Sequence, residues 1–321
     1  MNTFGSFFRV SIFGESHGRW VGVTIDGCPA GIPLKQGDLL PDLERRKAGA
    51  TGTTPRKEDD LPQFLSGVFN NTTTGAPLTI VFENNNIRSA DYEAIRATPR
   101  PGHADFVLHK KFNGHNDYRG GGHSSGRLTV ALVAAGVVAK KILKDITVAA
   151  TLTEAGGSTD IEAAIAHAIQ VQDSIGGIVA CTVSGLPVGL GEPFFDSVES
   201  VISHAVFAIP AVKGIEFGSG FAAAKMTGSV HNDAIIDSGG ATKTNHAGGI
   251  NGGITNGNEV YFRVAIKPTS STPREQHTWN NETQSVAPFT VKGRHDLCIA
   301  LRVPVVVEAV TMIALADLLA R

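Results

Sequence analysis

Short stretches in which apolar and polar residues alternate recur along the chain, and this spacing predicts β-strands. Polar, glycine-rich turns separate several of them; Asn70 to Gly75, for example, joins two neighbouring stretches. We expect strands at residues 8–12, 21–25, 64–69, 77–82, 146–152, 176–184, 213–217 and 260–266.

Apolar residues at helical spacing predict helices between these strands. The expected helices are 37–46, 89–96, 128–143, 160–172, 198–207 and 303–319. Each half of the chain thus holds strands and one long helix. This favours an α+β fold built in layers, with an internal pseudo-duplication. No short-period repeat and no linker interrupts the sequence, so we expect a single domain over residues 1–321.

Composition agrees with a globular protein that has a sizeable core, because 42% of the 321 residues are hydrophobic and 18% are charged. The formal net charge of −2 gives no general attraction to nucleic acid or membranes. Cys28, Cys181 and Cys298 are far apart and odd in number, which favours buried thiols in a reducing compartment. With no signal-peptide pattern and no membrane-length apolar run, we expect a cytoplasmic protein. The scattered histidines indicate no metal site.

One segment stands out for its chemistry: Arg119-Gly-Gly-Gly-His-Ser-Ser-Gly-Arg127, directly before the helix at 128–143. Glycines let a backbone approach a ligand closely, and a loop that enters a helix directs unpaired N–H groups at an anion. Ser124 and Ser125 can cap the helix or donate to a phosphate, and the two arginines can bind phosphate or carboxylate. A glycine-rich turn with a helix cap and no ligand is the less favoured alternative for this segment taken alone.

Two other glycine motifs suggest functions that their surroundings disfavour. Gly14-Glu-Ser-His-Gly18 matches the nucleophile elbow of serine hydrolases, but a strand pattern follows it where the elbow needs a helix. His17 in that turn is either a structural residue or an exposed proton donor. Gly218-Ser-Gly-Phe-Ala-Ala223 matches a dinucleotide fingerprint, but no βαβ unit surrounds it.

Several further loops carry groups that suit an anionic ligand. The cations after Glu44 at a helix end also have a simple structural explanation, as does the Arg100/His103 pair around a rigid turn. Taken together, the loops suit a small polyanionic substrate beside a flat, phosphate-bearing cofactor. These loops are 44–47, 100–103, 245–257, 267–271 and 293–296.

The same motifs resemble those of the chorismate synthase family. Phe13-Gly-Glu-Ser-His-Gly18 through Pro29 is similar to its first signature, Tyr118 through Arg127 to its second, and Gly293 through Ala309 to its third. The intervening stretches at 100–105, 210–214, 245–249 and 267–271 also fit, so the resemblance runs nearly end to end.

The resemblance implies a phosphate lyase with a layered β-α-β sandwich fold. Members eliminate phosphate from 5-enolpyruvylshikimate 3-phosphate to give chorismate, the last common step of aromatic amino acid biosynthesis. They require reduced FMN, although the reaction is redox-neutral, and they are homotetramers. Whether NADPH reduces the flavin on the enzyme itself, or an external flavin reductase supplies it, is left open. No nucleic acid or membrane partner is implied.

The resemblance also implies roles for particular residues. His17 would protonate the departing phosphate, His103 would sit by the flavin and balance its reduced, anionic form, and Asp296 would act as a base near flavin N5. Arginines would hold the substrate phosphate and carboxylates: Arg45, Arg46, Arg100 and Arg127. The FMN contacts would be His123, Ser124, Ser125, Pro210, Ala211, Gly252, Lys267, Pro268, Thr269, Ser270, Ser271 and Arg294.

The chain departs from the family pattern in a few places. Arg45-Arg-Lys-Ala-Gly49 stands where Arg-Arg-Arg-Pro-Gly is usual, Gly52 stands near a common arginine, and Pro210 replaces a polar residue. A flavin- or nucleotide-binding oxidoreductase and an inactive FMN-binding homologue are the alternatives. The first would oxidise its substrate, and the second would bind flavin without forming chorismate.

Overall fold

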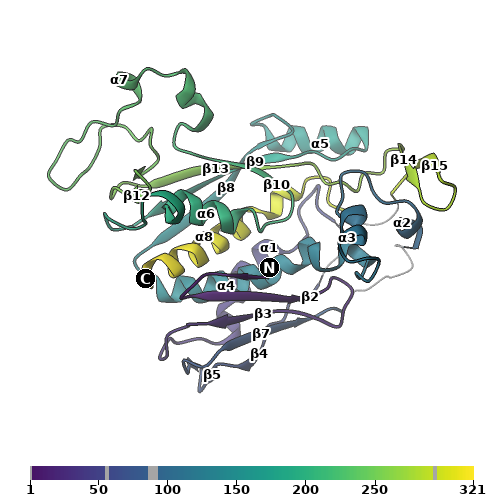
Figure 1. The fold of residues 1–321 in the computed structure, drawn as a ribbon, viewed down its shortest axis with the longest axis horizontal. Helices are drawn as coiled ribbons and strands as arrows, with labels where there is room; N and C mark the ends of the chain where they lie inside the picture. Colours follow the sequence, from purple (N-terminus) through teal and green to yellow (C-terminus); the bar gives the residue numbers. More distant parts are fainter. Residues whose placement is uncertain (1, 55–57, 86–92, 292–294) are drawn as a thin grey trace.

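Two antiparallel sheets enclose a layer of helices in the computed structural model, which describes residues 2–54, 58–85, 93–291 and 295–321 (Figure 1). The first sheet has the strand order β1-β2-β3-β7-β4, and the second has the order β10-β13-β9-β8. The strands of the first are Thr3–Phe4, Arg9–Gly14, Trp20–Asp26, Leu78–Glu83 and Gln63–Ser66, and those of the second are Val212–Phe217, Val260–Ile266, Gly177–Ser184 and Thr147–Ala155.

Period-two burial explains why these segments are strands. Along β13, Val260, Phe262, Val264 and Ile266 are buried while the residues between them are partly exposed. In the first sheet, β3 pairs Val23 with Ile80 of β7. The buried faces of both sheets contribute to the same hydrophobic core.

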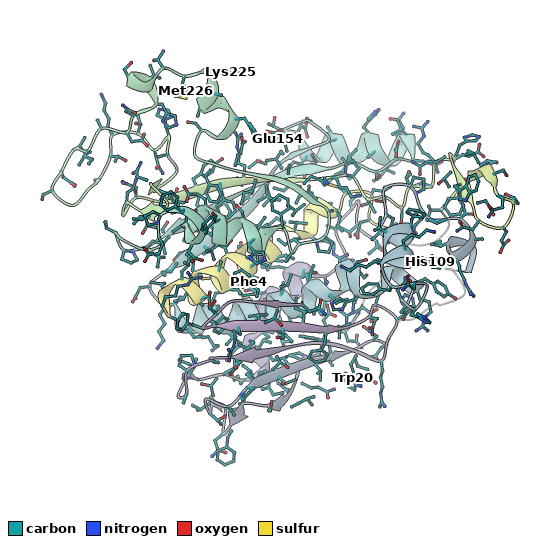
Figure 2. All side chains as sticks on the ribbon, viewed as in Figure 1. Phe4, Trp20, His109, Glu154, Lys225 and Met226 are labelled. Atoms are coloured by element: carbon teal, nitrogen blue, oxygen red, sulfur yellow. The ribbon has the colours of Figure 1, made fainter. Side chains whose placement is uncertain are left out.

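The long helices α4 (Thr129–Ile142) and α8 (Pro304–Leu319) fill the space between the sheets (Figure 1). α4 packs on β3 of the first sheet, α8 packs on β8 and β9 of the second, and the helices pack on each other. α8 is buried on every side from Val305 to Leu318, as expected for a helix inside a core. Figure 2 shows side chains filling these layers. The expected layered α+β fold is therefore confirmed.

Shorter helices complete the layers. α1 (Leu40–Arg46) and α6 (Val198–Val206) lie beside the long helices, and α5 (Ile161–Val171) packs on β8. The remaining helices are α2 (Glu93–Ala97), α3 (Asp105–Lys111) and α7 (Gly228–His231). α7 belongs to a segment that projects from the layers and carries Lys225 and Met226 (Figure 2), and none of residues 213–247 is buried.

Asp317 ties the two ends of the chain together. Its Oδ1 accepts hydrogen bonds from the backbone N–H groups of Ser6, Phe7 and Phe8, at 2.7, 2.6 and 3.0 Å. The carboxyl group is almost wholly buried near the end of α8, and Arg321 pairs with it at 3.5 Å. The last helix thus fixes the entry to the first sheet.

The two long helices approach each other closely at Gly136. A Cβ added there would lie 2.4 Å from Cβ and 2.5 Å from Cα of Ala309 on α8. Alanine normally stabilises a helix relative to glycine by about 1 kcal/mol. We expect Gly136→Ala to do the opposite and lower the free energy of unfolding by about 1–3 kcal/mol, because backbone atoms of α8 must move. Urea denaturation measures this change.

Gly37→Ala is the matched control, since a Cβ at Gly37 meets nothing within 4 Å. Stability of Gly136→Ala equal to that of Gly37→Ala would contradict the close helix contact.

The structure differs from the sequence prediction in several places. The expected strand 64–69 is divided at Gly67, whose φ of +82° turns the chain, so β4 is followed by β5 (Val68–Phe69), which pairs with β6 (Thr72–Thr73). The hairpin of β14 (Gln276–Asn280) and β15 (Ser285–Phe289) was not predicted, nor was α3. The loop 245–257 contains a small hairpin of β11 (Ile250–Asn251) and β12 (Ile254–Thr255). Of the expected helix 89–96, residues 89–92 lie outside the described residues.

The three cysteines are buried, as expected, and form no disulfide. Within the described ranges, no helix combines the length and the apolar character needed to cross a membrane.

Candidate active site

A cavity of about 550 Å³ opens where both long helices begin. It is lined at the start of α4 by Ser125, Gly126, Arg127 and Thr129, and at the start of α8 by Arg302, Val303 and Val306. Helix N-termini favour anions, because their first N–H groups lack partners within the helix. The other walls come from segments far apart in sequence: 46–48, 58–60, 100–104, 209–211, 267–271 and 295–299.

Positive side chains outnumber negative ones in this cavity. Among the described residues that line it, the acids are Glu58, Asp60 and Asp296. The cations are Arg46, Lys47, Arg100, Arg127, Lys267 and Arg302. The surplus, reinforced by the helix ends, predicts an anionic ligand with more than one charged group.

Asp60 joins two of the arginines. Its Oδ2 accepts from Arg46 Nη2 at 2.5 Å, and its Oδ1 accepts from Arg127 Nη1. All three side chains are buried, and Asp60 itself has no exposed side-chain surface. Burial alone would raise the pKa of Asp60, but the charges of Arg46 and Arg127 outweigh it and hold that pKa below its usual value. One carboxylate thus fixes two guanidinium groups and leaves a net positive charge.

Arg100 and His103 share a second carboxylate, Asp105. Arg100 Nε donates to Asp105 Oδ2 at 2.7 Å, and His103 Nδ1 lies 2.6 Å from Oδ1. Burial favours a neutral Asp105, but hydrogen bonds from Arg100 and His103 hold its pKa far below the usual value. Arg100 Nη1 also donates to Ser271 Oγ at 3.0 Å. The histidine is thereby fixed in orientation at the cavity wall.

Asp296 occupies a third position on the wall. Its Oδ1 accepts from the Thr54 N–H at 2.9 Å, and its Oδ2 lies 3.1 Å from Arg302 Nη1. Arg302 Nε donates to the Arg46 carbonyl oxygen at 2.9 Å. Burial lowers the pKa of Arg302, but the neighbouring Asp296 carboxylate opposes that effect.

Consecutive glycines of the segment 119–127 touch the two histidines. A Cβ on Gly120 would lie 2.5 Å from His17 Cε1, and one on Gly121 would lie 3.3 Å from His103 Cε1. Both glycines have positive φ, +60° and +84°. His17 is only 4% exposed, so the expectation of an exposed imidazole is wrong. Its ring lies beneath Gly120 and does not line the cavity, although Ser16 and Gly120 do. The glycines let the backbone pass closely over both imidazoles.

The loop 267–271 forms a wall rich in donors. Lys267 Nζ lies 2.9 Å from Ser270 Oγ and donates to the Gly102 carbonyl. The loop is thus hydrogen-bonded to the turn that carries His103. Burial and the nearby Lys213 charge lower the pKa of Lys267. Thr269 Oγ1 is buried and makes no hydrogen bond within the described part of the chain. Beside the loop, Ile209, Pro210, Ile299, Val303 and Val306 add apolar surface.

Most of the residues expected in the site line this one cavity: His103, Asp296, Arg46, Arg100, Arg127, Ser125, Pro210, Ala211 and Lys267 to Ser271. Ser125 also caps the turn before α4, since its Oγ accepts from the Arg127 N–H at 3.3 Å.

Other expected residues lie elsewhere. Arg45 faces away and pairs with Glu308 and Asp42, while His123 and Ser124 border a neighbouring, mainly apolar cavity. Gly252 lies in the β11–β12 hairpin and does not line the cavity. The residue after it, Gly253, accepts from the Val198 N–H at the start of α6, whereas Ile209, just after α6, does line the cavity. Arg294 lies outside the described residues.

Sequence reasoning missed Asp60, Asp105 and Arg302 as parts of the site. Asp105 ends the Arg100 to Asp105 motif, which was a signal for it. Arg302 lies within the stretch from Gly293 to Ala309 that resembles the third signature, whereas Asp60 belongs to no motif and is identified only by its contacts.

Comparison with known proteins decides the family. The sequence model of the family described as chorismate synthase matches residues 8–320. The chain belongs to the chorismate synthase family. A chorismate synthase of Chitinophaga pinensis is 70% identical over 318 residues, which cover 99% of this chain and 96% of that protein. One from Dehalococcoides mccartyi is 45% identical, covering 100% of this chain and 97% of the relative. An archaeal chorismate synthase, from Korarchaeum cryptofilum, is 44% identical over 98% and 96% of the two chains.

A solved structure agrees with the sequences. A crystal structure of chorismate synthase superposes with a TM-score of 0.75 at 25% identity, over 98% of this chain and 92% of the other. The fold and the family therefore match along nearly the whole chain. As a member of the chorismate synthase family, the protein is an enzyme: a lyase of aromatic amino acid biosynthesis that eliminates phosphate.

Proposed function

We propose that this enzyme removes phosphate from 5-enolpyruvylshikimate 3-phosphate to give chorismate and that it needs reduced FMN to do so. One observation carries the proposal: a single cation-rich cavity brings together His103, Asp296, Arg46, Arg100 and Arg127 from distant segments. The substrate is a polyanion with one phosphate and two carboxylates, which matches the excess of positive charge.

The arginines would hold the substrate and stabilise the departing phosphate. Arg46 and Arg127 are already oriented by Asp60, and Arg100 is oriented by Asp105, so little reorganisation is needed when the anion binds. In a partly dry cavity, such preorganised charges stabilise the negative charge that develops on the leaving oxygen.

The cavity wall around Lys267 fits the cofactor. The buried Thr269 hydroxyl lacks a partner in the described chain, and Lys267, Ser270, Ser271 and Ser125 offer further donors for a phosphate or ring oxygen. Pro210 and its apolar neighbours suit one face of a flat ring. When bound, reduced FMN supplies an electron-rich ring that assists loss of the phosphate without net oxidation.

Three side chains would manage protons in this scheme. The elimination breaks the bond from ring carbon to phosphate oxygen and removes the hydrogen at C6, and a new double bond forms. His17 would give a proton to the phosphate, since the arrival of a dianion raises the pKa of a neighbouring imidazole. His103, held by Asp105, would balance the reduced flavin's charge, and Asp296 would serve as a base near flavin N5, where it would help the cofactor take the C6 hydrogen.

The oligomeric state and the source of the reduced flavin are proposed from the family resemblance. We propose one domain over residues 1–321, a homotetramer and a cytoplasmic location, with the flavin reduced either by bound NADPH or by an external reductase. Large apolar side chains that are exposed on the projecting segment support association between copies: Phe221, Ile235 and Ile236 are 84%, 72% and 64% exposed.

An anaerobic assay tests the function. Purified protein is mixed with photoreduced FMN and 5-enolpyruvylshikimate 3-phosphate, and chorismate absorbance and phosphate release are followed. We expect equal amounts of both products with no net flavin oxidation. Flavin oxidation in proportion to product would instead indicate an oxidoreductase, and flavin binding without product would indicate an inactive homologue.

A further inference from the structure

Asn84 is a buried amide that contacts two parts of the site at once. It follows β7 directly, and its backbone N–H donates to the Arg19 carbonyl at 3.0 Å. Its side-chain Nδ2 donates to the carbonyls of Glu15 and Gly18, at 3.1 and 2.7 Å. Its Oδ1 accepts from Arg127 Nε at 2.8 Å.

These contacts fix the amide in one orientation. Two carbonyl oxygens need a donor on one side of Asn84, and the guanidinium N–H needs an acceptor on the other. A flipped amide would place donor against donor and oxygen against oxygen. An aspartate could still accept from Arg127, but it could not donate to the carbonyls of Glu15 and Gly18.

The two parts that Asn84 joins carry different chemistry. The carbonyls of Glu15 and Gly18 belong to the turn that holds His17, whose ring lies beneath Gly120. Arg127 lines the cavity and is held on its other side by Asp60. Asn84 therefore links the anion-binding guanidinium to the imidazole turn through one side chain, beside the backbone bond from the Ser16 N–H to the Gly122 carbonyl at 3.0 Å.

We propose that Asn84 is a positioning residue that holds the His17 turn in a fixed position relative to Arg127. Through this link, a phosphate group that binds at Arg127 changes the protonation of the His17 imidazole. This inference rests on the proposed function, in which His17 gives the proton to the departing phosphate. Asn84 itself is 7% exposed and does not line the cavity, so it acts only through its two neighbours.

Two substitutions test the link that Asn84 makes. Asn84→Asp keeps the acceptor for Arg127 and loses both donors to the turn, whereas Asn84→Ser is too short to reach both sides. We expect both variants to fold and to lower kcat by about 100-fold, with KM changed by less than about 3-fold, as for a displaced reacting group. The matched control is Asn85→Ser, since Asn85 is the neighbouring residue of the same type and is exposed.

A second readout does not depend on turnover. NMR of protein with ¹³C-labelled histidine shows the His17 resonance, which is assigned by its loss in His17→Gln. The pKa of His17 is then measured with and without inorganic phosphate. We expect phosphate to raise the His17 pKa in the wild type and in Asn85→Ser, and to have little effect in either Asn84 variant. Glu15, Asp117 and Arg119 also lie near His17 or its turn and are unchanged in all of these proteins.

The outcomes distinguish the inference from the proposed function. An Asn84→Asp enzyme with wild-type kcat and a wild-type phosphate response would overturn the inference, and so would loss of the fold in both variants, because Asn84 would then be a structural residue. A wild-type protein that forms no chorismate would contradict the proposed function, while the phosphate titration would still report whether Asn84 links Arg127 to His17.

Discussion

Asp60→Asn is expected to lower the free energy of unfolding by about 3–5 kcal/mol, because it leaves two buried arginines without their shared carboxylate. An asparagine at this position can accept from Arg127 or Arg46 but presents an N–H to the other. We also expect activity to fall by about 100-fold, since both guanidinium groups lose their orientation. Urea denaturation and the chorismate assay measure the two effects.

The pH dependence of the free energy of unfolding shows whether the loss of stability in Asp60→Asn is ionic. The pKa of Asp60 in the folded protein lies below its usual value, so its contribution to stability is present above the unfolded pKa of about 4 and is lost as the pH falls through the folded pKa. The stability gap between the wild type and Asp60→Asn should therefore be widest near neutral pH and narrow in acid. Asp59→Asn, next in sequence and exposed, is the control. A gap that stayed constant with pH would contradict the ionic explanation.

Gly120→Ala is expected to lower kcat by about 100-fold while the protein stays folded. The added methyl group would lie 2.5 Å from both His17 Cε1 and Nδ1 and 2.8 Å from Ser16 Oγ. The imidazole is buried and must shift, which moves the proposed proton donor away from the cavity wall. Steady-state kinetics in the chorismate assay measure the loss.

Backbone strain has to be separated from this clash. Gly157 also has a left-handed φ, +83°, but a Cβ there meets nothing within 4 Å. Gly157→Ala should thus lower the free energy of unfolding by about 1 kcal/mol and leave kcat unchanged. The positive φ of Gly120 alone should have the same effect on the stability of Gly120→Ala. Equal kcat values for the two variants would mean that Gly120 does not hold His17 in place.

The regular elements were predictable where one physical pattern dominates. The strict alternation of β13 and the long apolar run of α4 leave a single way to bury their side chains. Gly67 divides one predicted strand because its positive φ is a property of the backbone that alternation does not encode. The β14–β15 hairpin was missed because it buries little: Trp279 is 45% exposed and Val286 is 65% exposed.

The site was predictable only as separate loops. Motifs placed His103, Arg127 and Asp296 on candidate loops, but no rule of spacing brings residues from distant parts of the chain to one cavity. Arg45 and Arg46 are neighbours in sequence, yet helix geometry sends one to Glu308 and the other to Asp60. Asp60 escaped notice because its importance comes from tertiary contacts and from a left-handed φ of +51°, which a non-glycine residue seldom adopts.

The hydrogen bonds between Asp317 and the backbone N–H groups of residues 6–8 affect how the chain folds during its synthesis. The partners are separated by about 310 residues, since Ser6 and Asp317 differ by 311 positions. While the ribosome is still making α8, the entry to the first sheet has no anchor and α4 lacks the long helix that packs on it. The amino-terminal half must therefore wait, with apolar surface exposed, until the last residues emerge, and this is the interval in which chaperones would protect the nascent enzyme.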